Sequence, residues 1–124
     1  MEHGHVRPDT GDAVLALTLR SAHERLQRIE AVIDTGADSA LILPRPVIEQ
    51  LSPPVGRSMR VELADGSIAW LPSYRVWVMW HGRRRAVTVL ETTSDTPLAG
   101  MTLLAGSRLI VDVLPGGTVT VEEL

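Results

Sequence analysis

The sequence predicts an all-β domain with one or two short helices. Three observations carry this prediction: apolar residues favour a period of two, turn signals recur about every ten residues, and only two short stretches favour helix. At 124 residues the chain has the length of one domain, large enough to bury a core but too small for two packed lobes. We therefore expect a single small barrel or sandwich.

The first twelve residues predict no regular element. The stretch MEHGHVRPDTGD is polar and lacks the apolar core of a signal peptide. We expect residues 1–12 to be a loose N-terminal leader, in which His3 and His5 are exposed tail residues, and residues 13–124 to be the folded domain.

Four β-hairpins are predicted in order along the rest of the chain. The sharpest signal is Asp65-Gly66 within Arg60–Leu71, because a type I′ turn requires positive φ at both central residues. The other three turns are the polar SAHE between Ala13–Arg20 and Arg25–Ile33, His81-Gly82 between YRVWVMW and RRAVTVLE, and Pro115-Gly116-Gly117 between RLIVDVL and TVTVEEL.

Helix is expected at two places only. Pro44–Leu51 predicts a short helix opened by Pro46, since proline is well tolerated in a first helical turn. Met101–Ser107 predicts another, closed near Gly106.

Composition limits the partners. Apolar residues make up 44% and charged residues 22% of the chain, and the net charge of −3 argues against nucleic acid as a partner. No run approaches the roughly 20 apolar residues that span a bilayer, so no membrane partner is expected. The absence of cysteine fits a reducing compartment, and we expect a cytoplasmic protein. No spacing predicts a metal or cofactor site.

The tripeptide Asp-Thr-Gly occurs twice, at 9–11 and at 34–36. Only Asp34 follows an apolar strand and precedes another apolar run, in EAVIDTGADSALIL. Holding a carboxylate at the end of a core strand removes it from water, which costs free energy unless another group hydrogen-bonds to it or shares its proton. Asp, Thr and Gly are all turn formers, so the tripeptide alone is weak evidence; its apolar flanks strengthen it.

The order of three stretches resembles that of the retropepsin-like aspartic proteases, the single-lobe relatives of pepsin. These stretches are VIDTGA at Val32–Ala37, LADGS at Leu63–Ser67 and PLAGMTLL at Pro97–Leu104. The resemblance extends from about Ala13 to the C-terminus, and it is the combination of all three that is specific. It implies a small closed barrel lobe of the acid-protease type, with a flap hairpin that closes over an extended peptide.

The resemblance also assigns roles to residues. It implies that Asp34 is the catalytic carboxylate, that Thr35 bonds to the partner's equivalent loop, and that Gly36 offers backbone contacts to substrate. Substrate-binding positions are implied at Ala37, Asp38, Ala64, Asp65, Gly66 and Ser67. Retroviral members usually have an arginine where this chain has Met101, which leaves the role of Asp38 less well defined than that of Asp34.

Only one of the two tripeptides, that of Asp34, has the apolar flanks of a catalytic loop, and one such loop per chain implies a homodimer. An aspartic protease uses two carboxylates that share one proton, and the second would come from a second copy of the chain. The resemblance implies that terminal strands of both chains build the interface; the candidates here are AVLALTL and GTVTVEEL, which would otherwise be exposed sheet edges. The expected activity is hydrolysis of a peptide or protein substrate without a metal or cofactor.

Two other readings stay open at this point. The lobe could be a dimeric peptide-binding or assembly module that has lost proteolysis, or an ordinary small barrel in which DTGADS is a buried turn. Pairing of two Asp34 loops would separate the first two readings from the third, and cleavage would then separate the protease from the binding module.

Overall fold

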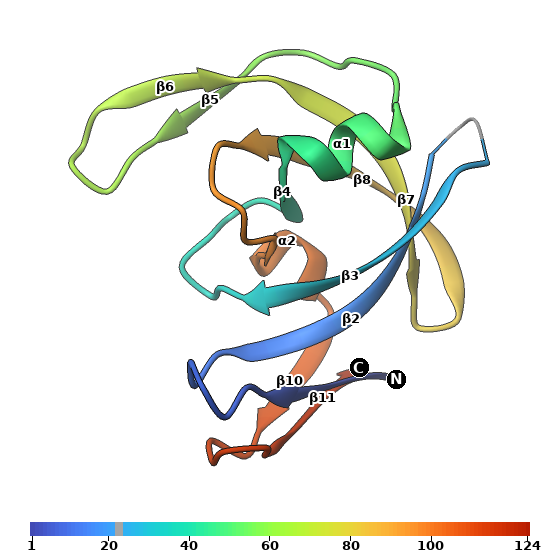
Figure 1. Ribbon diagram of the computed structural model, residues 1–124, viewed down its shortest axis with the longest axis vertical. Coiled ribbons are helices and arrows are strands. Elements are labelled where there is room, and N and C mark those ends of the chain that lie inside the picture. Colours follow the sequence, from blue (N-terminus) through green and yellow to red (C-terminus); the bar gives the residue numbers. More distant parts are fainter. Residues whose placement is uncertain (22–23) are drawn as a thin grey trace.

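The protein is built from one large curled sheet, one small sheet and two short helices (Figure 1). The computed structural model describes residues 1–21 and 24–124. The elements are β1 (Glu2–Val6), β2 (Ala13–Arg20), β3 (Leu26–Ile33), β4 (Leu41–Pro44), α1 (Arg45–Leu51), β5 (Met59–Glu62), β6 (Ile68–Leu71), β7 (Ser73–Trp80), β8 (Arg83–Thr92), β9 (Leu98–Ala99), α2 (Met101–Leu104), β10 (Ser107–Val111) and β11 (Thr118–Glu123).

The large sheet has nine strands in the order β10-β11-β1-β2-β3-β9-β4-β8-β7. Because β7 also pairs with β2, the strands from β2 to β7 form a ring. The small sheet is the β5–β6 hairpin, which projects from the top of the molecule in Figure 1. The prediction of an all-β domain with two short helices is confirmed. Within the described part of the chain, no helix is long and apolar enough to cross a membrane.

All four predicted hairpins form antiparallel strand pairs, namely β2–β3, β5–β6, β7–β8 and β10–β11. The turn predicted at SAHE includes residues 22–23, which lie outside the described residues. At the β7–β8 turn His81 and Gly82 both have positive φ, of 52° and 77°, as a type I′ turn requires.

The Asp65-Gly66 turn differs from the type I′ turn that the sequence predicts. Of these two residues only Gly66 has positive φ, at 85°. The Leu63 N–H donates to the Ser67 carbonyl at 2.8 Å, so the connecting loop has three residues, 64–66, rather than two. A glycine in the left-handed region is typical of the last position of such a loop.

The core lies inside the ring, where alternate residues of the strands point inward. On β2 the side chains of Leu15, Leu17 and Leu19 are at most 2% exposed, and they pack with Val76 and Val78 of β7. Burial of a leucine side chain contributes about 2 kcal/mol to folding, so the alternation on β2 supplies much of the driving force for its placement. Helix α1 closes one end of this core (Figure 1).

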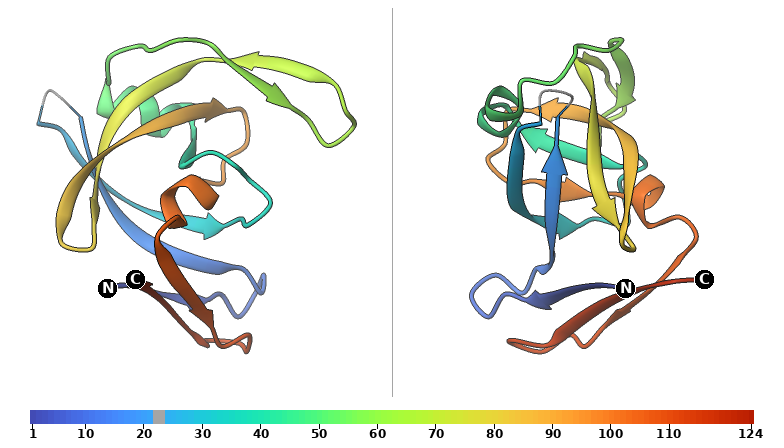
Figure 2. Two further views of the ribbon diagram at one scale, coloured as in Figure 1. Left: turned by 180° about the vertical axis from the view of Figure 1, so that it is seen from behind. Right: turned by 90° about the vertical axis from the view of Figure 1, so that its right-hand side faces the viewer.

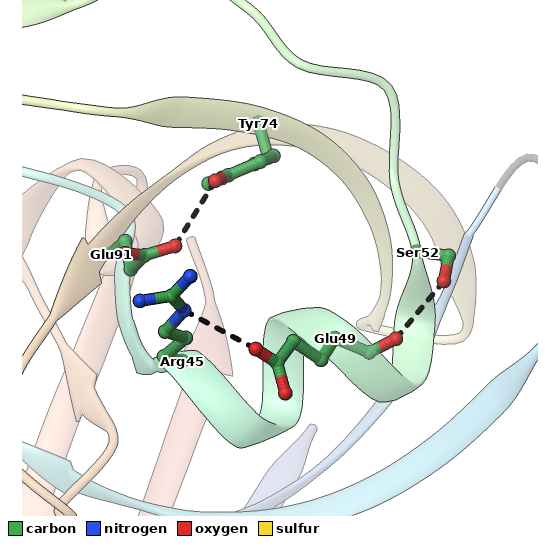
Figure 3. Close-up of polar contacts among 5 residues, drawn as sticks. All are labelled: Arg45, Glu49, Ser52, Tyr74 and Glu91. Carbon is green, nitrogen blue, oxygen red and sulfur yellow. Dashed lines mark hydrogen bonds and ion pairs between the residues drawn. The ribbon is translucent and has the colours of Figure 1, made fainter.

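Polar contacts hold α1 and the strands beside it (Figure 3). The Arg45 Nε donates to Glu49 Oε1 at 3.2 Å, and the Ser52 hydroxyl donates to the Glu49 carbonyl at 3.0 Å. The Tyr74 hydroxyl of β7 donates to Glu91 Oε1 of β8 at 3.0 Å. Burial, and secondly the neighbouring carboxylate, raise the pKa of Tyr74, so this phenol stays neutral and remains a donor at physiological pH.

The N-terminal residues are not a loose leader, and that prediction is wrong for residues 2–6. Strand β1 lies between β2 and β11 and pairs antiparallel with both. Its sequence, EHGHV, has one apolar side chain in the core, Val6, which is 2% exposed. Backbone pairing with distant strands, rather than an apolar pattern, orders this segment.

The placement of β1 also changes the edges of the sheet. From the sequence, the strands AVLALTL and GTVTVEEL are expected to be exposed edges unless a dimer covers them. Instead β2 has β1 and β3 as neighbours, and β11 has β10 and β1, so both strands are interior. Within the described residues, the strand left with a single neighbour at this end of the sheet is β10.

Candidate functional site

Asp34 is presented by a loop that leaves the end of β3 and returns as β4. Its side chain is half-buried, whereas Thr35 and Gly36 at the tip are exposed. The Asp34 N–H donates to the Ala99 carbonyl at 2.9 Å, which extends the β3–β9 pairing to the aspartate itself. The Ala37 N–H closes the turn by donating to the Asp34 carbonyl at 3.1 Å. The sheet therefore fixes the backbone from which the carboxylate projects.

One oxygen of the carboxylate is engaged within the loop. The Gly36 N–H donates to Asp34 Oδ1 at 2.9 Å. A Cβ at Gly36 would lie 3.2 Å from the same oxygen, so glycine leaves this carboxylate uncrowded. Within the described residues no hydrogen bond or ion pair engages the other oxygen, Oδ2, which remains open to a group from outside the loop.

The base of the loop is closed by β9, which lies between β3 and β4. The Gly100 N–H donates to the Ala40 carbonyl at 3.0 Å. A Cβ at Gly100 would fall 2.1 Å from the Ser39 carbonyl oxygen and 2.8 Å from that of Ala37. Only glycine fits at this close approach of two backbone segments.

Helix α2 holds the second half of the loop, residues 37–38, through hydrogen bonds. The Met101 N–H donates to the Ala37 carbonyl at 2.8 Å, and both the Thr102 N–H and the Thr102 hydroxyl donate to the Asp38 carbonyl. The Arg85 guanidinium donates to the carbonyls of Thr102 and Leu103, each at 3.0 Å. Backbone groups and Thr102 thus hold the loop at the position where retroviral members usually carry an arginine.

Asp38 contributes to this arrangement through its backbone carbonyl. Its side chain is exposed, and among the described residues it takes part in no ion pair. The Met101 side chain is 47% exposed and offers no charge to pair with Asp38. The structure therefore leaves the Asp38 carboxylate free for contacts outside the chain.

The other predicted site residues, Ala64, Asp65, Gly66 and Ser67, lie at the exposed tip of the β5–β6 hairpin. The Ser67 hydroxyl and the Ser67 N–H both donate to Asp65 Oδ1, and these bonds lower the pKa of Asp65. The tip and the Asp34 loop extend toward the same side of the molecule, on the right of the left-hand view in Figure 2. Within the described residues no hydrogen bond or ion pair joins them.

A surface cavity of about 320 Å³ lies against β8 and reaches Ser39 and Met59, but neither Asp34 nor the hairpin tip is among its lining residues. It is lined by Ser39 and Ala40 after the Asp34 loop, by Met59 at the base of the hairpin and by Thr102 of α2. Arg75 of β7 also lines it. Its volume is enough for one large side chain.

The first Asp-Thr-Gly lies elsewhere. Residues 9–11 belong to the turn between β1 and β2, where Gly11 has a φ of 77° and its N–H donates to the Arg7 carbonyl at 2.8 Å. Asp9 is exposed, and no strand ends at it. Asp9 is therefore a polar residue of an exposed turn.

The residues that hold the Asp34 loop could not be identified from the sequence. Gly100 and Thr102 lie in the stretch PLAGMTLL, but no local pattern indicates which carbonyls they contact. Arg85 lies in the basic HGRRR stretch, whose ordinary interpretation is a solvated turn. All three contacts join residues far apart in the sequence, so a tertiary structure was needed to find them.

Solved aspartic proteases share this fold. The EIAV protease complexed with the inhibitor HBY-793 superposes with a TM-score of 0.60 at 16% identity, covering 75% of this chain and 85% of that chain. A retropepsin-like aspartic protease from Rickettsia conorii gives a TM-score of 0.62 at 13% identity, covering 97% of this chain and 90% of that one. No protein-family model and no curated protein sequence matches the chain.

The protein therefore has the single-lobe fold of retropepsin-like aspartic proteases, and the resemblance that the sequence indicates is confirmed at the level of the fold. At these identities the likeness concerns the fold, whereas the roles of individual residues rest on the local geometry described above.

Proposed function

We propose that the protein is an aspartic endopeptidase that hydrolyses peptide bonds as a homodimer, with one Asp34 from each chain. The observation that carries this proposal is the Asp34 loop: in a retropepsin-like fold, β9 and α2 hold one half-buried carboxylate at a strand end, with Oδ2 open. A single carboxylate is half of such a site. The second half would be the same loop of a second copy.

Two carboxylates within hydrogen-bonding distance share one proton, because both cannot be ionised cheaply. The ionised Asp34 takes a proton from a bound water, whose oxygen attacks the scissile carbonyl. The protonated Asp34 donates its proton to the carbonyl oxygen, giving a tetrahedral diol intermediate. The proton taken from water then passes to the nitrogen as the C–N bond breaks, and a diol hydroxyl returns one proton to the dyad as the carboxylic acid product forms. Thr35, which is exposed, would bond to the partner's loop.

The substrate would be an extended peptide lying between the Asp34 loop and the β5–β6 hairpin, with the hairpin acting as a flap. A two-stranded hairpin is marginally stable alone, and this one exposes Leu63, Ile68 and Trp70 at 45%, 49% and 66%. A bound peptide would cover such apolar groups. The cavity beside Ser39 and Met59 would take one substrate side chain, while backbone groups bind the peptide as a strand.

The proposal is tested by incubating the purified chain with a mixture of peptides and identifying products by mass spectrometry. We expect internal cleavage whose rate per chain falls on dilution, in parallel with dissociation of the dimer in sedimentation velocity. Absence of cleavage at concentrations where the chain is dimeric would refute the proteolytic function. Full activity in a monomer would refute the shared site.

A separate prediction concerns the flap. Replacing Gly66 with valine should lower turnover about tenfold or more, because a β-branched residue strongly disfavours the φ of 85° at the tip. A Cβ there meets nothing within 4 Å, so the effect would come from the backbone and not from a clash. Asparagine tolerates this conformation, so Gly66→Asn is the matched control and should keep most of the activity. Equal turnover in both variants would show that the hairpin is no lid.

A further inference from the structure

The cavity of about 320 Å³ near the Asp34 loop is lined by positive charge. Two of its lining residues are arginines, Arg75 and Arg85, and no aspartate or glutamate of the described chain lines it. Asp38 precedes the lining residue Ser39 in the sequence but is itself outside the lining. In a chain whose net charge is −3, this cavity therefore favours a negatively charged ligand.

The two arginines differ in what their guanidinium groups contact. The Arg85 guanidinium donates to the carbonyls of Thr102 and Leu103, each at 3.0 Å, so its donors are partly engaged while its charge is not neutralised. Arg75 is exposed, and within the described residues its guanidinium takes part in no hydrogen bond or ion pair. The N–H donors of Arg75 are therefore available to a ligand that enters the cavity.

The strand register places Arg75 on the floor of the cavity. Arg75 lies opposite Thr88 in the antiparallel pair of β7 with β8, so both side chains project from the same face of the sheet. Ala86 and Leu90, the alternate neighbours of Thr88 on β8, project from that face too, and all three line the cavity. Arg75 thus projects from the face of the sheet that forms the cavity floor.

The cavity also adjoins both segments between which a peptide is proposed to lie. Ser39, which follows the Asp34 loop, lines it, and so does Thr102, whose hydroxyl donates to the Asp38 carbonyl. Met59, the first residue of β5 and the base of the hairpin, lines it as well. A peptide bound between the loop and the hairpin would therefore bring one of its side chains to this cavity.

We propose that the cavity selects a glutamate side chain of the peptide substrate, whose carboxylate pairs with Arg75. This inference rests on the proposed function, because it assigns the cavity to the substrate. The apolar side chains of Met59 and Leu90 suit the methylene groups of glutamate, and the planar guanidinium suits its carboxylate. The Ser39 hydroxyl, which has no hydrogen-bond partner within the described residues, is a further donor. The substrate class is therefore peptides with a glutamate at one fixed position.

The expected preference is moderate, because Arg75 is exposed to water. Ion pairs between exposed groups are screened and contribute little, whereas the cavity walls exclude part of the water and strengthen the pair. We expect glutamate to be preferred over lysine by about tenfold and over glutamine by about threefold. Reversing the charge at Arg75 has the larger effect, because it turns attraction of glutamate into repulsion and repulsion of lysine into attraction.

Binding tests this inference without catalysis. The probe is a fluorescein-labelled peptide rich in alanine and leucine, in which one glutamate, glutamine or lysine is moved through every position. Affinity for the Asp34→Asn chain is measured by fluorescence anisotropy. At one position we expect glutamate to bind more tightly than lysine, and Arg75→Glu in the same background should reverse that order. Arg75→Met keeps a long side chain without charge and should abolish the preference.

Arg84→Glu is the matched control. Arg84 lies opposite Met79 on the same face of the β7–β8 pair, with its guanidinium carbon 4.8 Å from the centre of the Trp77 ring, and it does not line the cavity. It makes the same change of net charge as Arg75→Glu, but it should leave the ratio of glutamate to lysine affinity nearly unchanged. An equal shift in both variants would mean that the whole surface attracts acidic peptides and that Arg75 selects nothing.

The remaining outcomes separate this inference from the proposed function. Failure of every peptide to bind, absence of a position that prefers glutamate, or an unchanged preference in Arg75→Glu would each overturn the role of the cavity. A preference that reverses as expected, in a protein whose wild-type chain cleaves no peptide, would leave that role standing and refute proteolysis. Cleavage that ignores the charge at every position would leave proteolysis standing and refute the selection of glutamate.

Discussion

Replacing Asp34 with asparagine is expected to abolish peptide cleavage while leaving the fold intact. Asparagine keeps the size of the side chain and the oxygen that accepts the Gly36 N–H at 2.9 Å, so the loop should retain its shape. It cannot accept or donate the proton that the proposed chemistry moves. General acid–base catalysis contributes about 10² to 10⁴ in rate, and both dyad members are lost at once, so a fall of about 10³ or more is expected.

Asp9→Asn is the matched control for this substitution, because it changes the same residue in the same tripeptide. Asp9 lies exposed in the β1–β2 turn, so its replacement should leave cleavage nearly unchanged. Circular dichroism checks that both variants fold. If Asp9→Asn is as inactive as Asp34→Asn, the chain uses both tripeptides and the homodimer model is wrong.

Mixing adds a test of the shared site. Excess Asp34→Asn chains should inhibit the wild-type chain, because mixed dimers would hold one carboxylate instead of two. If excess Asp34→Asn chains leave the wild-type rate unchanged although mixed dimers form, the site is not shared between two chains.

Local signals in the sequence predicted most of the elements. The alternation in AVLALTL directs its apolar side chains into the core in only one strand register. His81 and Gly82 adopt the positive φ that their turn requires at both positions. Of the two prolines in PRPVIEQL, Pro46 lies in the first turn of α1, as the sequence predicts. The Asp34 loop was found in the same way, because an apolar strand, a turn and a second apolar run are all local.

What the sequence could not predict depends on distant contacts. Strand β1 contains a single core residue, and its order comes from pairing with β11, more than a hundred residues away. Once β1 fills that place, β11 and β2 become interior and β10 becomes the edge. The loop length at Asp65-Gly66 follows from the register of Glu62 with Ile68, which a dipeptide cannot specify.

The contacts that hold the Asp34 loop are also made by residues distant in the sequence. Among these residues, Gly100 is the one whose substitution should disturb the loop most. Gly100→Ala is expected to destabilise the protein by about 3 kcal/mol, because a Cβ would fall 2.1 Å from the Ser39 carbonyl oxygen. The backbone at Gly100 has a φ of −106°, which any residue adopts, so lack of space is the reason and not conformation. Thermal unfolding followed by circular dichroism measures this loss.

The same substitution should also impair the site itself. The carbonyls that must move away from the new Cβ belong to Ser39 and Ala37, and Ala37 is the residue whose N–H closes the turn at Asp34. Displacement of about 1 Å at a reacting group can cost about 10² in rate. Turnover measured well below the melting temperature, where the variant is folded and dimeric, should therefore still be far below that of the wild type.

Gly11→Ala separates this effect from a general cost of replacing glycine. A Cβ at Gly11 meets nothing within 4 Å, and its φ of 77° makes alanine unfavourable by about 1 kcal/mol. That variant should lose some stability but keep its turnover, because the β1–β2 turn supports no part of the Asp34 loop. If Gly100→Ala is as stable and as active as the wild type, the contact between Gly100 and Ser39 does not hold the loop, and the candidate site loses its main support.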